Sequence, residues 1–258
     1  QTRQRRQFAP SQPTDTVQCG ESLPPFQWPQ QACINSEVAI KIEFIQSPLR
    51  FFYTFDGQSR LDVIQMMLEM TEKYTPPTVD LRVRKMKKDL LVVVSHENIL
   101  HRARILQVLD EFTCIVFCVD FGNIFTVRKE HLYYLRCKYA IIPAQAQMGA
   151  LFNVIPINGR TDWADTDTAA LFHMVNHAEP LSAHLKQLDQ GKGCASFTIY
   201  TKINGRLFCV NNEMVRLGVA DFYDEKYIYQ VPGDPVTTSL ASSESRHAQL
   251  NPTAPASL

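Results

Sequence analysis

Hydrophobic and polar residues alternate along the first dense part of the chain. The alternation runs over 38–45 and Ser47-Pro48 interrupts it, after which the aromatic-rich residues 51–55 predict a returning strand. Period-two alternation is typical of a strand with one buried face. The pattern therefore predicts a β-hairpin.

A helical pattern follows the hairpin. Ser59 is expected to cap a helix that continues to about Tyr74, because Pro76-Pro77 prevents continuation. The predicted apolar face consists of Leu61, Ile64, Met67, Leu68 and Thr71. The pattern predicts a strand pair covered by a helix.

Closely spaced apolar runs then predict a second group of strands at 90–95, 101–109, 113–119 and 123–127. Such short strands, separated by tight turns, are typical of a small, strongly bent barrel. Beyond them the pattern predicts a mostly apolar stretch at 145–155, a helix at 167–177, and strands near 182–188, 194–202 and 205–210. A last helix, capped by Asn211 or Asn212, is expected to end at Gly218.

The two ends of the chain differ from this pattern. Residues 1–33 and 232–258 are rich in polar residues and proline without a period, so both are expected to be flexible tails. Phe26 and Trp28 are exceptions, which either pack on the edge of the folded part or contact a partner. The first residue is Gln rather than Met, so we expect an excised fragment.

Composition narrows the class of protein. The 258 residues include 26 basic and 26 acidic ones, so any nucleic-acid or membrane contact must be local. Seven cysteines at irregular spacing do not resemble a disulfide framework, which favours a reducing compartment. No apolar run reaches about 18 residues, so no membrane span is expected.

One basic run lies within the folded part, at 81–88. It contains Arg82, Arg84, Lys85, Lys87 and Lys88. A solvated connecting segment is the simpler interpretation, and contact with phosphate or an acidic peptide is the alternative. No aromatic residues that could stack on bases are interleaved with these cations, which weighs against RNA.

Several motifs together resemble the extended Tudor family. They are His101-Arg-Ala-Arg104, Val116-Phe-Cys-Val-Asp-Phe-Gly-Asn123, Leu132, Leu135 and Ile142-Pro-Ala-Gln-Ala146. The resemblance implies a mainly β fold with helices (α+β). A Tudor β-barrel at 88–140 would be inserted into an oligonucleotide-binding-type, staphylococcal-nuclease-like domain formed by 38–77 and 145–222.

The resemblance also implies a function. Such proteins are germline scaffolds of the PIWI-interacting RNA pathway, in the cytoplasm and in perinuclear germ granules (nuage). Their Tudor domains bind Arg-rich N-terminal tails of PIWI proteins, often after symmetric dimethylation of arginine. Oligomerisation through regions outside this chain is a further possibility for a scaffold.

In this family four aromatic residues and an asparagine form a cage for the methylated arginine. The matching positions here are Val94, His101, Cys118, Phe121 and Asn123. Only Phe121 and Asn123 keep the expected chemistry, since Val94 and Cys118 have no π system and a protonated histidine repels a cation. We therefore expect binding without a requirement for methylation, with a residual methylarginine reader and an RNA-binding module as alternatives.

Each cage position also has a purely structural interpretation. Phe121 could plug the barrel rim, and Asn123 could supply the positive φ of a turn. Asp120, beside Gly122, is expected to fix the turn or to pair with an arginine.

Catalysis and metal binding find little support, so we expect no enzyme, no cofactor and no metal. Asp62 and Glu69 share a predicted helix without metal-ligand spacing, although Glu43 and Asp56 lie nearby in sequence. Cys114 and Cys118, followed by His131 and Cys137, raise the question of a zinc site. Their spacing in an apolar strand favours buried core residues instead.

Overall fold

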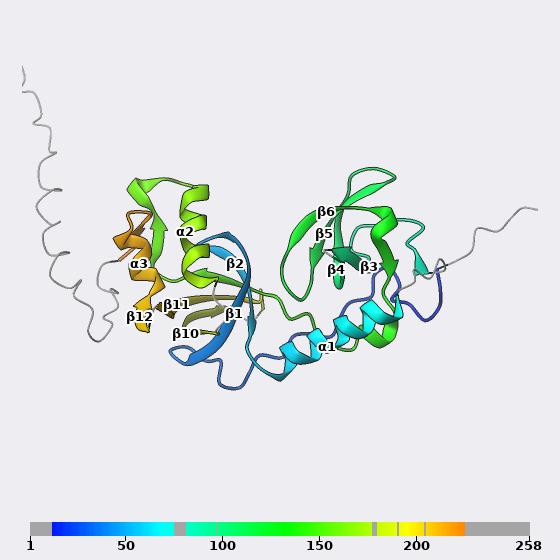
Figure 1. The fold of residues 1–258 in the computed structure, drawn as a ribbon, viewed down its shortest axis with the longest axis horizontal. Coiled ribbons are helices and arrows are strands. Elements are labelled where there is room, and N and C mark those ends of the chain that lie inside the picture. The colour runs from blue at the N-terminus through cyan, green and yellow to red at the C-terminus, as the bar shows by residue number, and fades with distance from the viewer. Residues whose placement is uncertain are drawn as a thin grey trace, which may run out of the picture.

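The computed structural model describes residues 12–74, 81–96, 98–176, 180–189, 191–203 and 205–224. The tail expected at 232–258 lies outside these residues, as do residues 1–11 of the tail expected at the other end. Figure 1 shows two lobes joined by the polypeptide around helix α1 (Gln58–Lys73).

The first lobe, called here the large lobe, is built on a six-stranded sheet in the order β10-β1-β2-β8-β11-β12. The strands are β1 (Glu37–Ser47), β2 (Arg50–Phe55), β8 (Gln147–Leu151), β10 (Leu181–Asp189), β11 (Cys194–Ile203) and β12 (Arg206–Cys209). Strand β10 also pairs with β11, so five of these strands close into a barrel. The lobe therefore combines the predicted hairpin with strands that follow about a hundred residues later.

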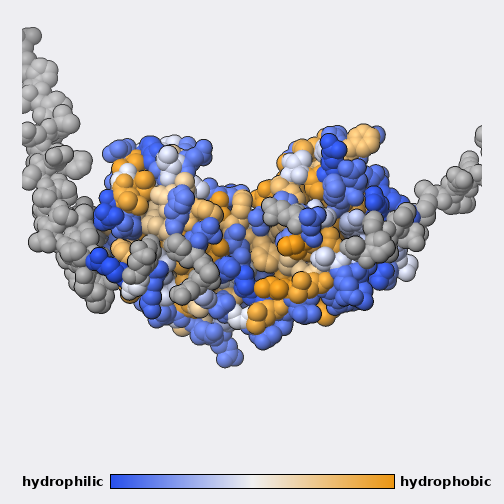
Figure 2. Space-filling model, viewed as in Figure 1, coloured by the Kyte–Doolittle hydropathy of each residue, from blue (hydrophilic) through white to orange (hydrophobic). Residues whose placement is uncertain are grey.

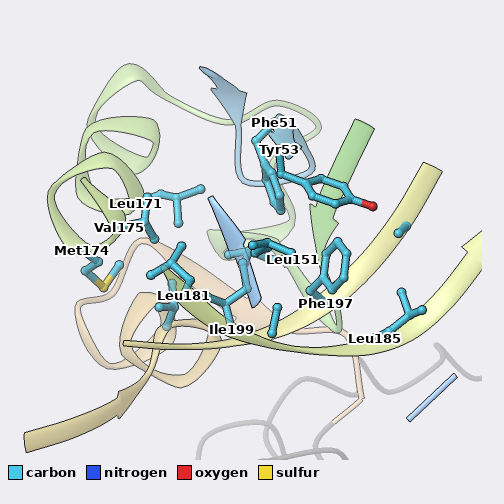
Figure 3. Close-up of a cluster of buried hydrophobic side chains, with 14 of the residues drawn as sticks. Phe51, Tyr53, Leu151, Leu171, Met174, Val175, Leu181, Leu185, Phe197 and Ile199 are labelled. Atoms are coloured by element: carbon cyan, nitrogen blue, oxygen red, sulfur yellow. The ribbon is translucent and has the colours of Figure 1, made fainter. Parts of the chain in front are cut away.

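Helices and a small sheet cover this barrel. They are α2 (Asp165–Val175), α3 (Val210–Arg216), β9 (Val154–Pro156) and β13 (Ala220–Phe222). Figure 3 shows the core, in which Phe51, Tyr53 and Phe197 from the sheet lie in one cluster with Leu171 and Met174 of α2. Helix α2 therefore closes the barrel over a continuous hydrophobic core.

Asn211 has a different role from the predicted cap. Cys209 is the N-cap of α3, and Asn211 lies fully buried in its first turn. Its side chain accepts a hydrogen bond from the Ile199 N–H and donates to the carbonyls of Phe152 and Phe197. The cap prediction is wrong because these backbone groups, distant in sequence, use the amide instead.

The second lobe, called here the small barrel, is a five-stranded antiparallel sheet in the order β6-β5-β4-β3-β7. The strands are β3 (Leu91–His96), β4 (Ile99–Val108), β5 (Thr113–Cys118), β6 (Ile124–Arg128) and β7 (Leu132–Tyr134). They coincide with the four predicted strands and add a short fifth. A strongly bent sheet of alternating inward side chains buries its core with few residues.

Helix α1 packs on the small barrel with a face that differs from the prediction. Val63, Met66, Met67 and Met70 are buried, whereas Leu61 and Leu68 are 57% and 61% exposed. The helix also begins before Ser59, with Gly57 as N-cap. Two apolar stripes run along the helix, and the buried one is the stripe that packs with Leu91, Val93 and Leu100.

Residues 12–33 pack against both lobes, so the expected flexible tail is wrong for them. Val17 is buried and donates its N–H to the Leu135 carbonyl at 2.8 Å. Phe26 and Trp28 contact the Phe55 ring at centroid distances of 6.2 and 5.7 Å. These two aromatics therefore pack on the edge of the large lobe, which is the first of the two interpretations given above.

Candidate functional site

The Asp-Phe-Gly-Asn turn links β5 to β6 and faces the large lobe. The Gly122 N–H donates to the Cys118 carbonyl at 2.8 Å, and the Cys118 N–H donates to the Asn123 carbonyl at 2.8 Å. The positive φ of the turn, +82°, belongs to Gly122. The alternative in which Asn123 supplies it is therefore wrong, and the side chain of Asn123 is not required by the turn geometry.

Asp120 anchors the turn through a buried ion pair with Arg102. Arg102 Nε and Nη2 donate to the two carboxylate oxygens at 2.9 and 2.6 Å. The remaining donors reach the carbonyls of Tyr139, Ile142 and Pro143. All five guanidinium N–H groups are thus used, as burial of this cation demands. Of the two structural roles expected for Asp120, the structure shows the pairing with an arginine.

This pair also joins the small barrel to the strand that re-enters the large lobe. The Gln145 N–H donates to Asp120 at 3.3 Å, and the Ala146 N–H donates to the Val119 carbonyl at 3.1 Å. Strand β8 begins at the next residue. The turn and the entry into β8 are therefore held as one unit.

Gly122 lies against Phe52 of β2. A Cβ atom at this glycine would lie 2.2 Å from the Phe52 Cβ, closer than any real contact. The Phe52 ring lies 5.2 Å from the ring of Phe117 on β5. Only glycine therefore fits this contact between the lobes, for steric as well as backbone reasons.

Four rings form a row at one end of the small barrel. Phe125 stacks on His96 at a centroid distance of 4.3 Å, and His96 lies 6.3 Å from His101. His101 in turn meets Phe121 edge to face at 5.7 Å. We call Phe125, His96, His101 and Phe121 the ring row. It brings together strands β6, β3 and β4 and the turn.

Val94 and Cys118 lie elsewhere. Both are closed off in the core of the small barrel, where Val94 is 0% and Cys118 is 1% exposed. Burial, with a smaller contribution from Asp120, raises the pKa of the Cys118 thiol to about 12. Of the five predicted cage positions, only His101 and Phe121 join the ring row.

Asn123 lines a cleft of about 560 Å³ between the turn and the large lobe. The other walls are Ile42, Glu43, Phe44 and Ile45 of β1 and residues of α2, including Asp165 and Phe172. Figure 2 shows the surface hollowed between the two lobes. Asp165 gives the cleft an exposed carboxylate, which suits a cationic side chain, whereas Glu43 is already paired with Arg60.

The predicted acidic and thiol candidates are used structurally. Glu43 accepts hydrogen bonds from Thr54 and Arg60, each at 2.9 Å, and Glu69 pairs with Lys138 at 2.6 Å. Cys114 is buried in the barrel core and His131 lies beside Glu130. Among the described residues, no three His, Cys, Asp or Glu side chains are grouped so as to hold a metal ion.

The basic run lies beside β7 on the small barrel. Leu81 and Val83 point inward, while Lys85, Lys87 and Lys88 are exposed. Arg82 forms a β-bridge with Tyr133, and the Arg84 N–H donates to the Tyr134 hydroxyl.

Within the described part of the chain, no helix has the length and apolar character needed to cross a bilayer.

A comparison with known families gives a match over the small barrel and the segments on either side of it. Residues 34–153 match the family described as Tudor domain. This part of the chain is therefore similar to a Tudor domain. The curated Tudor domain-containing protein 5 of Danio rerio is 28% identical over 151 residues, which cover 56% of this chain and 16% of that protein. This chain thus spans about one-sixth of that relative.

Solved structures confirm the fold beyond the small barrel itself. The extended Tudor domain TD3 from mouse TDRD1, in complex with a MILI peptide containing dimethylarginine 45, superposes with a TM-score of 0.65 at 14% identity. The match covers 81% of this chain and 100% of that one. The Drosophila melanogaster Papi extended Tudor domain (D287A), in complex with a Piwi N-terminal R10-unme peptide, superposes with a TM-score of 0.63 at 16% identity. That match covers 72% of this chain and 98% of the other. The predicted mainly β extended Tudor fold is confirmed.

Sequence reasoning missed three residues of this site in the small barrel. His96 and Phe125 belong to different strands, and only the barrel brings their rings together. Arg102 lies in the His101-Arg-Ala-Arg104 motif, but the sequence does not distinguish it from Arg104 as the arginine that needs a buried partner.

Proposed function

We propose that the chain is a non-catalytic peptide-binding adaptor of the PIWI-interacting RNA pathway. It binds the Arg-rich N-terminal tail of a PIWI-family protein without requiring arginine methylation. In this proposal 88–140 is the Tudor barrel, and 38–77 with 145–222 forms the staphylococcal-nuclease-like part. Tudor domains are peptide-binding modules rather than enzymes, and both neighbours described above hold peptides.

The ring row is the observation that carries the proposal. Two of its four rings are imidazoles, which are weaker π partners for a cation than phenyl or indole rings and lose that role when protonated. A neutral imidazole nitrogen also accepts a hydrogen bond from a guanidinium N–H. Symmetric dimethylation replaces two of those N–H groups with methyl groups. The methylated arginine therefore gains little affinity for the ring row.

The acidic cleft supports an arginine-rich ligand. Asp165 is exposed on the cleft wall, and Asn123 offers an amide oxygen there. A chain that passes from the ring row into the cleft would place one arginine at the rings and a neighbouring one near Asp165. Exposed charge pairs of this kind contribute more to encounter rate and specificity than to affinity.

A titration tests the proposal. One Arg-Gly peptide, unmodified and symmetrically dimethylated, is titrated by fluorescence anisotropy against the chain. We expect the two dissociation constants to agree within about threefold, because fewer than two full cation–π contacts of roughly 0.5–1 kcal/mol are available. A methylated peptide that binds tenfold more tightly would sink the idea and favour the residual methylarginine reader.

Variants assign the binding to the ring row. Phe121→Ala is expected to weaken both peptides about fivefold, whereas Tyr223→Ala removes an aromatic ring that is 79% exposed on the large lobe and serves as control. The pair His96→Phe and His101→Tyr restores aromatic faces and should give the methylated peptide an advantage of about tenfold. Location in perinuclear germ granules of the cytoplasm is part of the same proposal, tested by imaging the tagged chain.

A further inference from the structure

The basic run lies beside an aromatic side chain from a distant hairpin. A surface hollow of about 550 Å³ is lined by Arg84, Lys85 and Met86 on one side. Val108, Asp110, Glu111 and Phe112, from the β4–β5 hairpin, and Lys129 complete it. The sequence offered no aromatic within the basic run, and the fold supplies one.

Phe112 is held outward by a rigid turn. The Asp110 carboxylate accepts hydrogen bonds from the backbone N–H groups of Phe112 and Thr113, at 2.7 and 2.8 Å, and from the Thr113 hydroxyl. The Phe112 carbonyl accepts from the Lys129 N–H at 2.7 Å. The ring itself is 70% exposed. A large aromatic held in water at the tip of a fixed hairpin gives up little further entropy when a ligand binds.

The charges around this ring favour a polyanion. Lys85, Lys87, Lys88 and Lys129 form no ion pair with any residue that the structure describes. The carboxylate of Asp110 is engaged in its own turn, where the Thr113 hydroxyl and then the Phe112 N–H lower its pKa. Asp110 therefore stays ionised, and the hollow sets the three cations Arg84, Lys85 and Lys129 against the two carboxylates of Asp110 and Glu111. The local balance is therefore positive although the chain as a whole is neutral.

We propose that Phe112, Arg84, Lys85 and Lys129 form a contact surface for single-stranded RNA. Phe112 serves as the platform on which a base stacks, and the cations attract the phosphates on either side. Sequence-tolerant binding of single strands combines these two elements, an aromatic face and a cationic track. An acidic protein segment would use the same lysines but gains less from a flat exposed ring. The surface is separate from the ring row and the cleft, so it is independent of peptide binding.

A labelled oligouridine tests the surface. The probe has about 12 nucleotides, within the usual range of roughly 4–16 per module, and anisotropy is measured on the full chain. Phe112→Ala should weaken binding about fivefold or more, and Phe112→Trp should restore it, because stacking depends on the aromatic face. Tyr223→Ala, which removes a similarly exposed aromatic on the large lobe, should leave the affinity unchanged.

Charge variants complete the test. Replacing Lys85 and Lys129 by Gln should flatten the salt dependence, by about 0.7 in the log–log slope for each phosphate that no longer pairs with a lysine. Glu111→Gln should tighten binding. Lys192→Gln and Lys202→Gln, which are exposed on the large lobe, are the matched controls.

Three results would overturn the proposal. They are no anisotropy change up to about 10⁻⁴ M protein, an unchanged affinity in Phe112→Ala, or capture of a Glu-rich peptide by the same surface while oligouridine fails to bind. The last result would assign the surface to an acidic protein partner. Thermal melts of each variant confirm folding, and the Arg-Gly titration of Phe112→Ala should match the unsubstituted chain.

Discussion

The two sides of the Asp-Phe-Gly-Asn turn differ in what they do for the molecule. Asp120 and Gly122 face inward, where they contact Arg102 and Phe52 and hold the lobes together. Phe121 and Asn123 face outward, to the ring row and the cleft. Side chains along this short segment thus alternate in direction, so that one set stabilises the fold and the other is available to a ligand. The resemblance to a family rests on both sides equally, whereas ligand preference depends on the outward side and its neighbours.

Among the variants that test this difference, Arg102→Ala is expected to have the largest effect on stability. It leaves the Asp120 carboxylate buried without its cation, which is expected to cost about 3–5 kcal/mol of unfolding free energy. Urea denaturation followed by circular dichroism measures the loss. Lys138→Ala is the matched control, because its ion pair with Glu69 has the same 2.6 Å separation but lies on the surface. Equal destabilisation by the two variants would contradict the assignment of Arg102 to the structural side.

Gly122→Ala should have the next largest effect. The new Cβ must displace Phe52, which is expected to cost about 1–3 kcal/mol beyond the backbone strain. Gly159→Ala separates the two contributions, since Gly159 also has a positive φ, +68°, but nothing lies within 4 Å of its would-be Cβ. Urea midpoints of the two variants give the difference. A Gly122→Ala variant no less stable than Gly159→Ala would show that the lobes do not depend on this contact.

The smallest expected effect concerns the buried thiols. Burial raises the pKa of Cys114 to about 11 and that of Cys118 to about 12. The folded state holds these two thiol protons more tightly than the unfolded chain does. The protonated thiols therefore contribute fully to the free energy of unfolding below the ordinary thiol pKa of about 8.5, and this contribution is lost as the pH rises toward 11 and 12. Stability should fall by about 1 kcal/mol per pH unit and thiol in that window.

The variant Cys118→Val removes one of these titrations while keeping an apolar side chain of similar size. Its urea midpoint should therefore decline less between about pH 9 and pH 10.5 than that of the unsubstituted chain. Peptide binding at neutral pH should be unchanged, since Cys118 lies on the inward side. An equal decline in the variant would place the alkaline transition on other groups, such as Tyr74, whose pKa burial raises to about 12.

Local patterns in the sequence were enough to predict most elements and their order. Apolar runs located strands of both lobes, Pro76-Pro77 predicted that the helix would end near Tyr74, and the turn motif pointed to the Tudor resemblance. These features are local, because the period of burial and the backbone limits of proline and glycine depend on near neighbours alone. The role of Asp120 also followed from its place beside a tight turn.

Which surfaces meet could be learned only from the packing of the folded chain. It chose between the two apolar stripes of α1, ordered residues 12–33, and used Asn211 to satisfy three backbone groups. It also brought His96 to Phe125, Arg102 to the carbonyls of residues 139–143, and Phe112 to the basic run. Each of these contacts joins segments far apart in sequence, so its energy depends on the packing of the whole chain and leaves no local pattern to read.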